Sequence, residues 1–264
     1  MDSGCRAICR ILAGELSRGD PVNKLKMKDH RRPTVDRSMS ESEDLSLQRI
    51  KEVSTKHPGA SVNHVLAAVA CLTLRAYYMK YEPSVITKQQ RLTAIFTLSL
   101  RQPDEDPISE GSIGNRFGPG YLALPIHLED PCEVLRNLKA QMDRVQTSPE
   151  PAIRDSLLGV ASNLPITKTQ FGELLLDAYG KVTLCYSNIK GPSEIVHLGG
   201  VAIRKINFFP FIPVGLYFGI VSYVGKVHSS ISVCSDCEPN AANLARLWPA
   251  AFEQLHSATM SQKA

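Results

Sequence analysis

The residues best suited to chemistry lie in a few short segments of this 264-residue chain. A helix is predicted to begin after Ser61, so Asn63 and His64 fall in its first turn, where unpaired backbone N–H groups and the helix dipole favour negative charge. An amide there can orient a carbonyl oxygen, although helix capping alone also explains Asn63. His64 is either a base that titrates near neutral pH or a tolerated residue without that role, because a base must also reach a hydroxyl within hydrogen-bond distance.

A second polar segment follows a predicted strand. Ser187 and Asn188 end an apolar run and precede the Gly191-Pro192 turn. Their side chains are therefore either presented at the end of a sheet or part of an ordinary polar turn. The segment Gly114-Asn115 is itself a turn signal, so Asn115 is first of all a turn residue.

Histidine and cysteine spacing gives no metal site. The seven histidines are isolated from one another, and the seven cysteines are odd in number and irregularly spaced. Cys234-Ser235-Asp236-Cys237 has the spacing of a metal knuckle, but tetrahedral zinc needs two more ligands, and no second CxxC or HxxxH is present. We therefore expect no metal and no disulfide framework, with reduced and partly buried thiols.

The predicted helices and strands alternate irregularly. Helices are expected over 46–56, from Ser61 onward, over 130–146, twice between 151 and 178, and over 240–256. Strands are expected over 91–101, 121–126, 182–187, 201–209, 216–223 and 226–233. This order favours an α/β fold with a mixed sheet covered by helices. Residues 1–45 contain a polar stretch without a sustained hydrophobic period, and we interpret them as a connector.

Composition excludes several classes of protein. With 43% hydrophobic residues the chain can bury a substantial core, and its net charge of +4 is spread along the sequence. Nucleic acid is not indicated, because phosphate binding needs a concentrated basic patch. Arg6, Arg10 and Glu15 interrupt the apolar N-terminal stretch, so no signal peptide is predicted. Prolines and glycines break the apolar run 208–224, which is therefore not predicted to cross a membrane.

Taken in order, these segments resemble the C-terminal lobe of wax ester synthase/diacylglycerol acyltransferases over roughly residues 20–260. The segment Ala60–Ala70 is similar to the family's Thr-Val-Asn-Asp-Val helix start, with His64 in place of the aspartate. The other matches follow in the family's order: Leu98-Ser99-Leu100-Arg101, Gly114-Asn115, Leu124-Pro125 ahead of Asp130-Pro131, Ser187-Asn188-Ile189-Lys190-Gly191-Pro192, and Pro210, Pro213 and Gly215 with Ser222-Tyr223-x-Gly225.

This resemblance implies the two-lobed CoA-dependent acyltransferase fold, similar to chloramphenicol acetyltransferase, with residues 46–262 as the C-terminal lobe and 1–45 as the interlobe connector. It implies transfer of a fatty acyl group from acyl-CoA, a substrate rather than a cofactor, to a long-chain alcohol or diacylglycerol. The family's base is a histidine of a His-His-x-x-x-Asp-Gly motif in the N-terminal lobe, and this sequence has no such motif. We therefore expect a truncated product or partial gene model that is inactive alone and pairs with an N-terminal lobe or a complete homologue.

Under the same resemblance, active-site support falls to Asn63, His64, Ser99, Arg101, Asn115, Ser187 and Asn188. Arg101 either pairs with a carboxylate of the other lobe or is an ordinary surface arginine. The Phe-rich segment 208–223 either lines an acyl channel or packs in the core. The expected location is cytoplasmic, peripheral to a membrane or lipid droplet. The alternative function is a non-catalytic module that binds lipid or acyl-CoA, or a partner of a complete enzyme.

Overall fold

The centre of the molecule is a mixed seven-stranded sheet. The computed structural model describes residues 19–31, 35–90, 92–101, 116–162 and 167–262. Within them the strand order is β1-β9-β8-β5-β3-β4, and β2 also pairs with β9. The strands are β1 (Arg37–Glu41), β2 (Leu45–Ser46), β3 (Thr93–Ser99), β4 (Phe117–Ala123), β5 (Leu184–Lys190), β8 (Leu216–Tyr223) and β9 (Lys226–Cys234).

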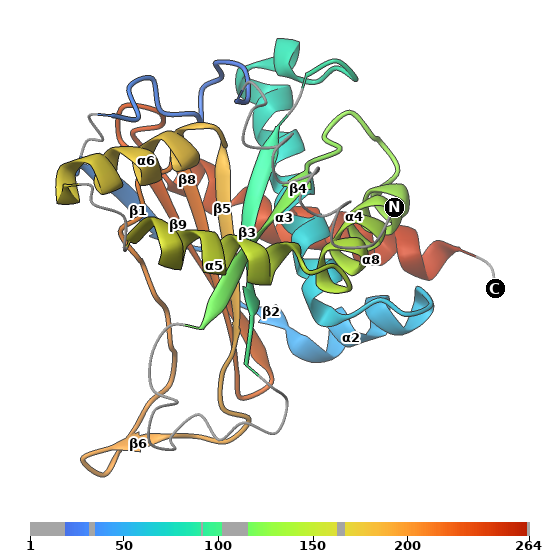
Figure 1. Ribbon diagram of the computed structural model, residues 1–264. Helices are drawn as coiled ribbons and strands as arrows, with labels where there is room; N and C mark the ends of the chain where they lie inside the picture. Colours follow the sequence, from blue (N-terminus) through green and yellow to red (C-terminus); the bar gives the residue numbers. More distant parts are fainter. Residues whose placement is uncertain (1–18, 32–34, 91, 102–115, 163–166, 263–264) are drawn as a thin grey trace.

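Strand direction decides where the candidate residues meet. β5 runs parallel to both of its neighbours, β3 and β8, whereas the other pairs in the sheet are antiparallel. The C-terminal ends of β3, β5 and β8 therefore lie at the same end of the sheet (Figure 1). This arrangement confirms the predicted mixed sheet with covering helices.

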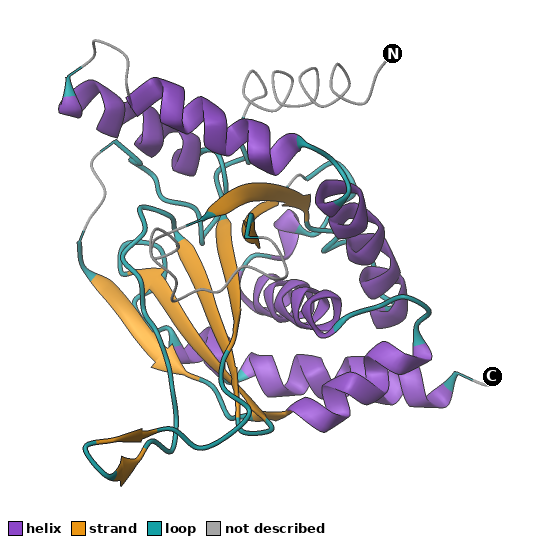
Figure 2. Cartoon of the chain, turned by 60° about the horizontal axis from the view of Figure 1, so that its bottom comes forward, coloured by secondary structure: helices purple, strands orange, loops and turns teal. Residues whose placement is uncertain are grey.

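Helices cover the sheet on both faces (Figure 2). They are α2 (Leu47–Lys56), α3 (Val62–Tyr81), α4 (Pro131–Gln146), α5 (Glu150–Ser162), α6 (Lys168–Gly180), α7 (Ala242–Ala245) and α8 (Leu247–Ser261), with a 3₁₀ turn at Pro83–Val85. The long helix α3 packs against α2, α4 and α8. The larger core fully buries Leu66 of α3, Phe218 of β8 and Trp248 of α8. The rings of Phe218 and Trp248 meet edge to face, with their centroids 5.5 Å apart.

A smaller core lies on the opposite face of the sheet. Ile95, Cys185 and Tyr217 are buried there, and Tyr179 of α6 packs against them. Successive side chains of a strand point to opposite faces. Along β5, Cys185 accordingly faces the α6 side, whereas Tyr186 belongs to the core beneath α3.

Two helix starts follow directly from the sequence. The Ser61 hydroxyl accepts a hydrogen bond from the backbone N–H of His64, and Asp130 accepts one from the N–H of Cys132 at 2.9 Å, with Pro131 at the first helical position. Both caps satisfy backbone donors that have no partner within the helix. The predicted starts after Ser61 and at Asp130-Pro131 are thus confirmed.

Three strand predictions need correction. Residues 37–41, inside the segment interpreted as a connector, form the edge strand β1 on β9. In the predicted strand 201–209 only Val201–Ala202 (β7) pairs, with His197–Leu198 (β6), because this hairpin projects away from the sheet and the residues after it have no strand partner in the described chain (Figure 1). β4 begins at Phe117 rather than Tyr121.

The early start of β4 depends on a glycine. Gly120 lies opposite Phe96 in the register of β3 and β4, and a Cβ atom at Gly120 would stand 2.4 Å from the Phe96 ring. Gly118, Pro119 and Gly120, which are residue types common in turns, therefore continue the strand, since only glycine at position 120 leaves room for the Phe96 ring. Pro119 is tolerated because β4 lies at the edge of the sheet.

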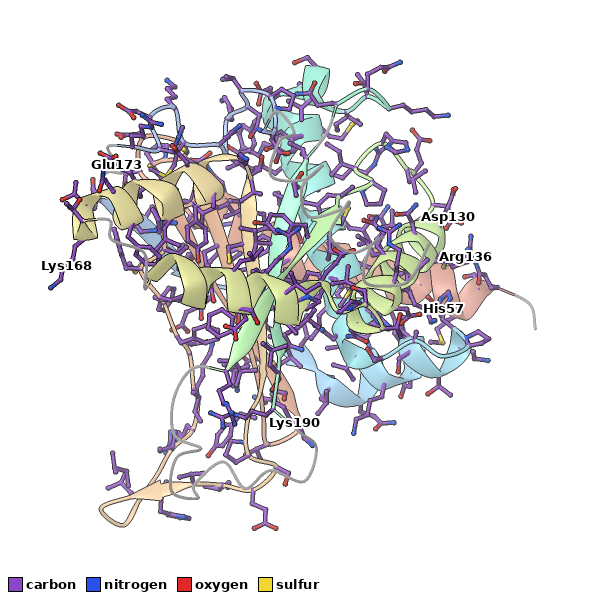
Figure 3. All side chains as sticks on the ribbon, viewed as in Figure 1. His57, Asp130, Arg136, Lys168, Glu173 and Lys190 are labelled. Carbon is purple, nitrogen blue, oxygen red and sulfur yellow. The ribbon has the colours of Figure 1, made fainter. Side chains whose placement is uncertain are left out.

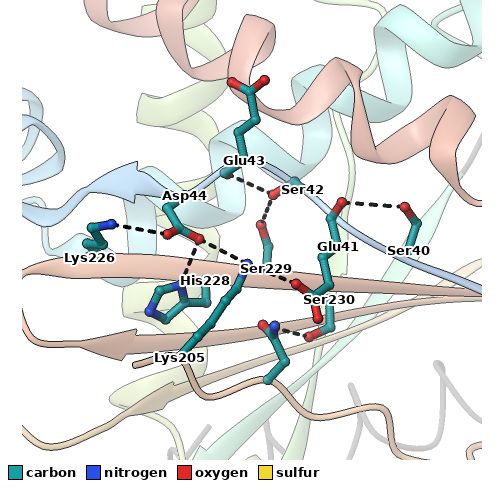
Figure 4. Close-up of polar contacts among 11 residues, drawn as sticks. Ser40, Glu41, Ser42, Glu43, Asp44, Lys205, Lys226, His228, Ser229 and Ser230 are labelled. Atoms are coloured by element: carbon teal, nitrogen blue, oxygen red, sulfur yellow. Dashed lines mark hydrogen bonds and ion pairs between the residues drawn. The ribbon is translucent and has the colours of Figure 1, made fainter. Parts of the chain in front are cut away.

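An ionic cluster ties the loop between β1 and β2 to the sheet (Figure 4). Asp44 accepts a hydrogen bond from Nδ1 of the buried His228 at 2.7 Å and lies 3.1 Å from Nζ of Lys205. Lys205 also pairs with Glu41 at 2.9 Å, and Lys226 lies 3.5 Å from Asp44. Partial burial acts to raise the pKa of Asp44, but the bonds from His228 and Lys205 outweigh it and lower the pKa.

Replacing Asp44 with asparagine should lower the free energy of unfolding by about 1 kcal/mol at pH 7, because the charged contacts with His228 and Lys205 are lost. The effect is no larger because solvent partly screens these contacts. A carboxylate whose pKa is lower in the folded state adds stability above its ordinary pKa of 3.8 and loses it as the pH falls through the folded value. The difference between the two proteins in urea unfolding should therefore persist down to about pH 4 and shrink below it. Glu43→Gln, whose side chain points away from the cluster in Figure 4, is the control and should show no such trend.

Candidate active site

Three polar side chains meet where the start of α3 faces the C-terminal end of β5. The Tyr186 hydroxyl donates to Oδ1 of Asn63 at 2.7 Å, and Nδ2 of Asn188 approaches the same oxygen at 3.4 Å. Asn63 lies in the first turn of α3, while Tyr186 and Asn188 are two residues apart on β5 and therefore share a face. The structure thus brings together two segments that are 123 residues apart in sequence.

The hydrogen bonds fix how this cluster is presented. Burial raises the pKa of Tyr186 far above its usual range, so its hydroxyl remains protonated and donates. Because Oδ1 of Asn63 accepts both bonds, Nδ2 of Asn63 points elsewhere as a donor. Oδ1 of Asn188 is buried without a hydrogen-bond partner in the described part of the chain. Within the described residues, the cluster therefore offers the amide nitrogen of Asn63 as a donor and Oδ1 of Asn188 as an acceptor beside a helix N-terminus.

His64 points away from this cluster. Its Nδ1 accepts a hydrogen bond from the backbone N–H of Ser61 at 3.0 Å, and its Nε2 lies 3.4 Å from Oδ1 of Asp143 on α4 without aligning for a hydrogen bond. Burial lowers the pKa of His64 and outweighs the opposing effect of Asp143. A neutral imidazole packed between a helix cap and α4 fits a capping role better than that of a base near Asn188.

Ser187 and Ser99 belong to the other side of the sheet edge. The Ser187 side chain is buried, and its hydroxyl lies 3.3 Å from the hydroxyl of Thr97. It lies on the face of the sheet that Cys185 and Tyr217 share beneath α6. Ser99 ends β3, is exposed, and accepts a hydrogen bond from the backbone N–H of Arg101 at 3.3 Å. Ser187 and Ser99 therefore lie at the same end of the sheet as Asn188, but on the opposite face. Asn115 lies outside the described residues.

The other histidines lie elsewhere. His57 is buried between helices, where its Nε2 lies 3.2 Å from the hydroxyl of Thr259, and burial lowers its pKa. In Figure 3, His57 lies with Asp130 and Arg136 near the helices α2, α4 and α8, well away from Lys190 at the end of β5. Neither His57 nor the His228 of the ionic cluster faces Asn63.

Sequence reasoning missed Tyr186. A tyrosine in the middle of an apolar strand looks like an ordinary core residue, and it is indeed 3% exposed. The alternation Tyr186, Ser187, Asn188 was the available signal, because it places the tyrosine and the asparagine on one face.

Neither a metal-binding cluster nor a membrane-spanning helix is found in residues 19–31, 35–90, 92–101, 116–162 and 167–262. No group of three or more His, Cys, Asp or Glu side chains there is arranged to hold a metal ion. Nor does any helix in these ranges combine the length and the apolar character that crossing a bilayer requires.

Comparison with known proteins gives the family. The family model of the WS/DGAT C-terminal domain matches residues 113–256. The chain belongs to this family. The diacylglycerol O-acyltransferase Tgs4 of Mycobacterium tuberculosis H37Rv is 26% identical over 228 residues, covering 81% of this chain and 44% of its own length. The wax ester synthase/diacylglycerol acyltransferase 2 of Arabidopsis thaliana is 31% identical over 148 residues, covering 53% of this chain and 30% of its own length.

Solved structures confirm the fold of this WS/DGAT C-terminal domain. The wax ester synthase/diacylglycerol acyltransferase of Marinobacter aquaeolei VT8 superposes with a TM-score of 0.62 at 17% identity, over 97% of this chain and 55% of its own. The trichothecene 15-O-acetyltransferase of Fusarium sporotrichioides superposes with a TM-score of 0.60 at 10% identity, over 98% of this chain and 53% of its own. The chain thus has the CoA-dependent acyltransferase fold and spans about half the length of these relatives.

Proposed function

We propose that this chain forms the C-terminal lobe of an O-acyltransferase that moves a fatty acyl group from acyl-CoA to a long-chain alcohol or diacylglycerol. In this proposal the chain supplies one wall of the active site, and residues 46–262 make up the lobe. A histidine from a His-His-x-x-x-Asp-Gly segment of another polypeptide region supplies the base. The enzyme works at the surface of a membrane or lipid droplet.

The observation that carries the proposal is the cluster of Asn63, Tyr186 and Asn188. Acyl transfer to an alcohol needs a donor for the oxyanion formed from the thioester and an acceptor that orients the attacking hydroxyl or the base. Asn63 Nδ2 is available as the donor and Asn188 Oδ1 as the acceptor, and the dipole of α3 favours the developing negative charge. The two asparagines lie in two of the segments that resemble family motifs, Ala60–Ala70 and Ser187–Pro192.

The test is an assay of ester formation from radiolabelled palmitoyl-CoA with hexadecanol or diacylglycerol. The chain is measured alone and fused behind the N-terminal half of the Marinobacter relative, a protein of which this chain covers 55%. We expect ester from the fusion and none from the chain alone or from the N-terminal half alone. Binding of a fluorescent acyl-CoA to each protein is measured in parallel.

His64 provides the internal control for the source of the base. His64→Ala should leave the ester-forming rate of the fusion within about threefold, because the imidazole faces Asp143 and the helix cap. Ester formation by the chain alone would contradict the proposed external base, and its loss in His64→Ala would identify His64 as the base. Acyl-CoA binding without turnover in the fusion would instead favour the non-catalytic lipid-binding module.

A further inference from the structure

The CxxC segment closes the last strand of the sheet. Cys234 is the final residue of β9, and the chain turns there, with the backbone N–H of Cys237 donating to the carbonyl oxygen of Cys234 at 2.9 Å. A β-turn of this kind keeps its first and fourth Cα atoms within about 7 Å. A disulfide joins Cα atoms roughly 4.4 to 6.8 Å apart. The turn therefore holds Cys234 and Cys237 at a Cα separation that a disulfide can span.

We propose that Cys234 and Cys237 are a reversible thiol/disulfide pair, oxidised by a small disulfide such as oxidised glutathione. The partly exposed Cys237 attacks the small disulfide as a thiolate, forming a mixed disulfide and releasing one small thiolate. Cys234 then attacks the Cys237 sulfur as a thiolate, forming the protein disulfide and releasing the second small thiolate. The two released thiolates take up the two protons, so one small disulfide is reduced as one protein disulfide forms.

The surroundings make this exchange slow. Burial raises the pKa of Cys237 to about 12, the neighbouring Cys234 adds to this, and the guanidinium of Arg37 opposes it. Little thiolate is therefore present at neutral pH, and attack on an oxidant is slow. Because the Cys237 thiolate is not stabilised, the reduced form lacks the advantage that it has in oxidoreductases whose thiolate is strongly stabilised.

The disulfide would restrain a turn that matters to the packing of α3. Glu238 follows Cys237 directly and is buried, and its Oε2 accepts a hydrogen bond from the hydroxyl of Tyr77 at 2.6 Å. That bond ties the C-terminal half of α3 to the end of β9. Asn63 lies at the opposite end of the same helix, so the pair is separate from the candidate active site.

The test uses the full chain equilibrated in buffers with a series of reduced-to-oxidised glutathione ratios. Free thiols are alkylated, the protein is reduced, and the released thiols are alkylated with an isotopically heavy form of the same reagent before peptide mapping. We expect heavy label on both Cys234 and Cys237 together as the buffer becomes more oxidising. The deeply buried Cys71 and Cys185 should carry light label, introduced on unfolding, at every ratio.

Single variants separate the two steps. Cys234→Ala should stop at a glutathione adduct on Cys237, whereas Cys237→Ala should leave the buried Cys234 unmodified. The inference is overturned if the wild-type pair stays reduced at every ratio, or if Cys237 carries glutathione without forming the protein disulfide. It is also overturned if stoichiometric Zn²⁺ protects both thiols from alkylation, because the pair would then be part of a metal site.

Discussion

Replacing Asn63 with alanine should lower the rate constant for ester formation by the fused enzyme about 100-fold, the typical cost of losing one oxyanion donor. The loss should appear in kcat more than in KM, because the donor acts on charge that develops in the transition state. The cluster geometry is the reason, since Tyr186 and Asn188 both occupy Oδ1 of Asn63 and leave its Nδ2 free to donate. The measurement is steady-state kinetics with palmitoyl-CoA and hexadecanol.

Tyr186→Phe distinguishes positioning from packing in the same assay. This change keeps the buried ring and removes only the hydroxyl that orients Asn63, so we expect a roughly tenfold fall in kcat. Tyr217→Phe is a matched control, because Tyr217 is equally buried on the neighbouring strand but belongs to the smaller core on the other face of the sheet. Equal kinetic effects of the two variants would show that the loss of any buried hydroxyl in this part of the sheet, rather than the loss of the Asn63 contact, lowers the activity.

The sequence predicted the helices and central strands well because their signals are local. Ser61 and Asp130 are caps whose bonding is complete within one turn, and the apolar runs of β3 and β8 favour buried strands. The resemblance to the acyltransferase family added the fold, which local patterns alone do not determine.

Long-range pairing explains what the sequence did not reveal. β1 contains the polar sequence Arg-Ser-Met-Ser-Glu and becomes a strand because β9 offers it an edge, where the guanidinium of Arg37 bonds Ser232 and the carbonyl of Val214. The opposite error occurred after β7, where residues with strand propensity pair with no strand of the described chain. Likewise the Asn63–Tyr186 bond depends on the packing of α3 against β5, which neither segment encodes alone.

Asp20 is a further residue whose importance only the structure shows. It is 4% exposed, and its carboxylate accepts hydrogen bonds from the backbone N–H and hydroxyl groups of both Thr93 and Thr183 at 2.7 to 3.0 Å. Thr93 begins β3 and Thr183 immediately precedes β5. One side chain from the segment before β1 thus holds together the starts of the two parallel strands whose other ends carry the candidate active site.

Replacing Asp20 with alanine should lower the free energy of unfolding by about 3 kcal/mol, because the change removes the acceptor for several buried donors. For a chain of this size the midpoint of thermal unfolding should fall by roughly 6 to 12 °C. Asp155→Ala, at an exposed position on α5, should change the stability by less than about 0.5 kcal/mol and serves as the control. Equal stability losses in the two variants would mean that Thr93 and Thr183 find water or other acceptors, and that β3 and β5 hold their register through the sheet alone.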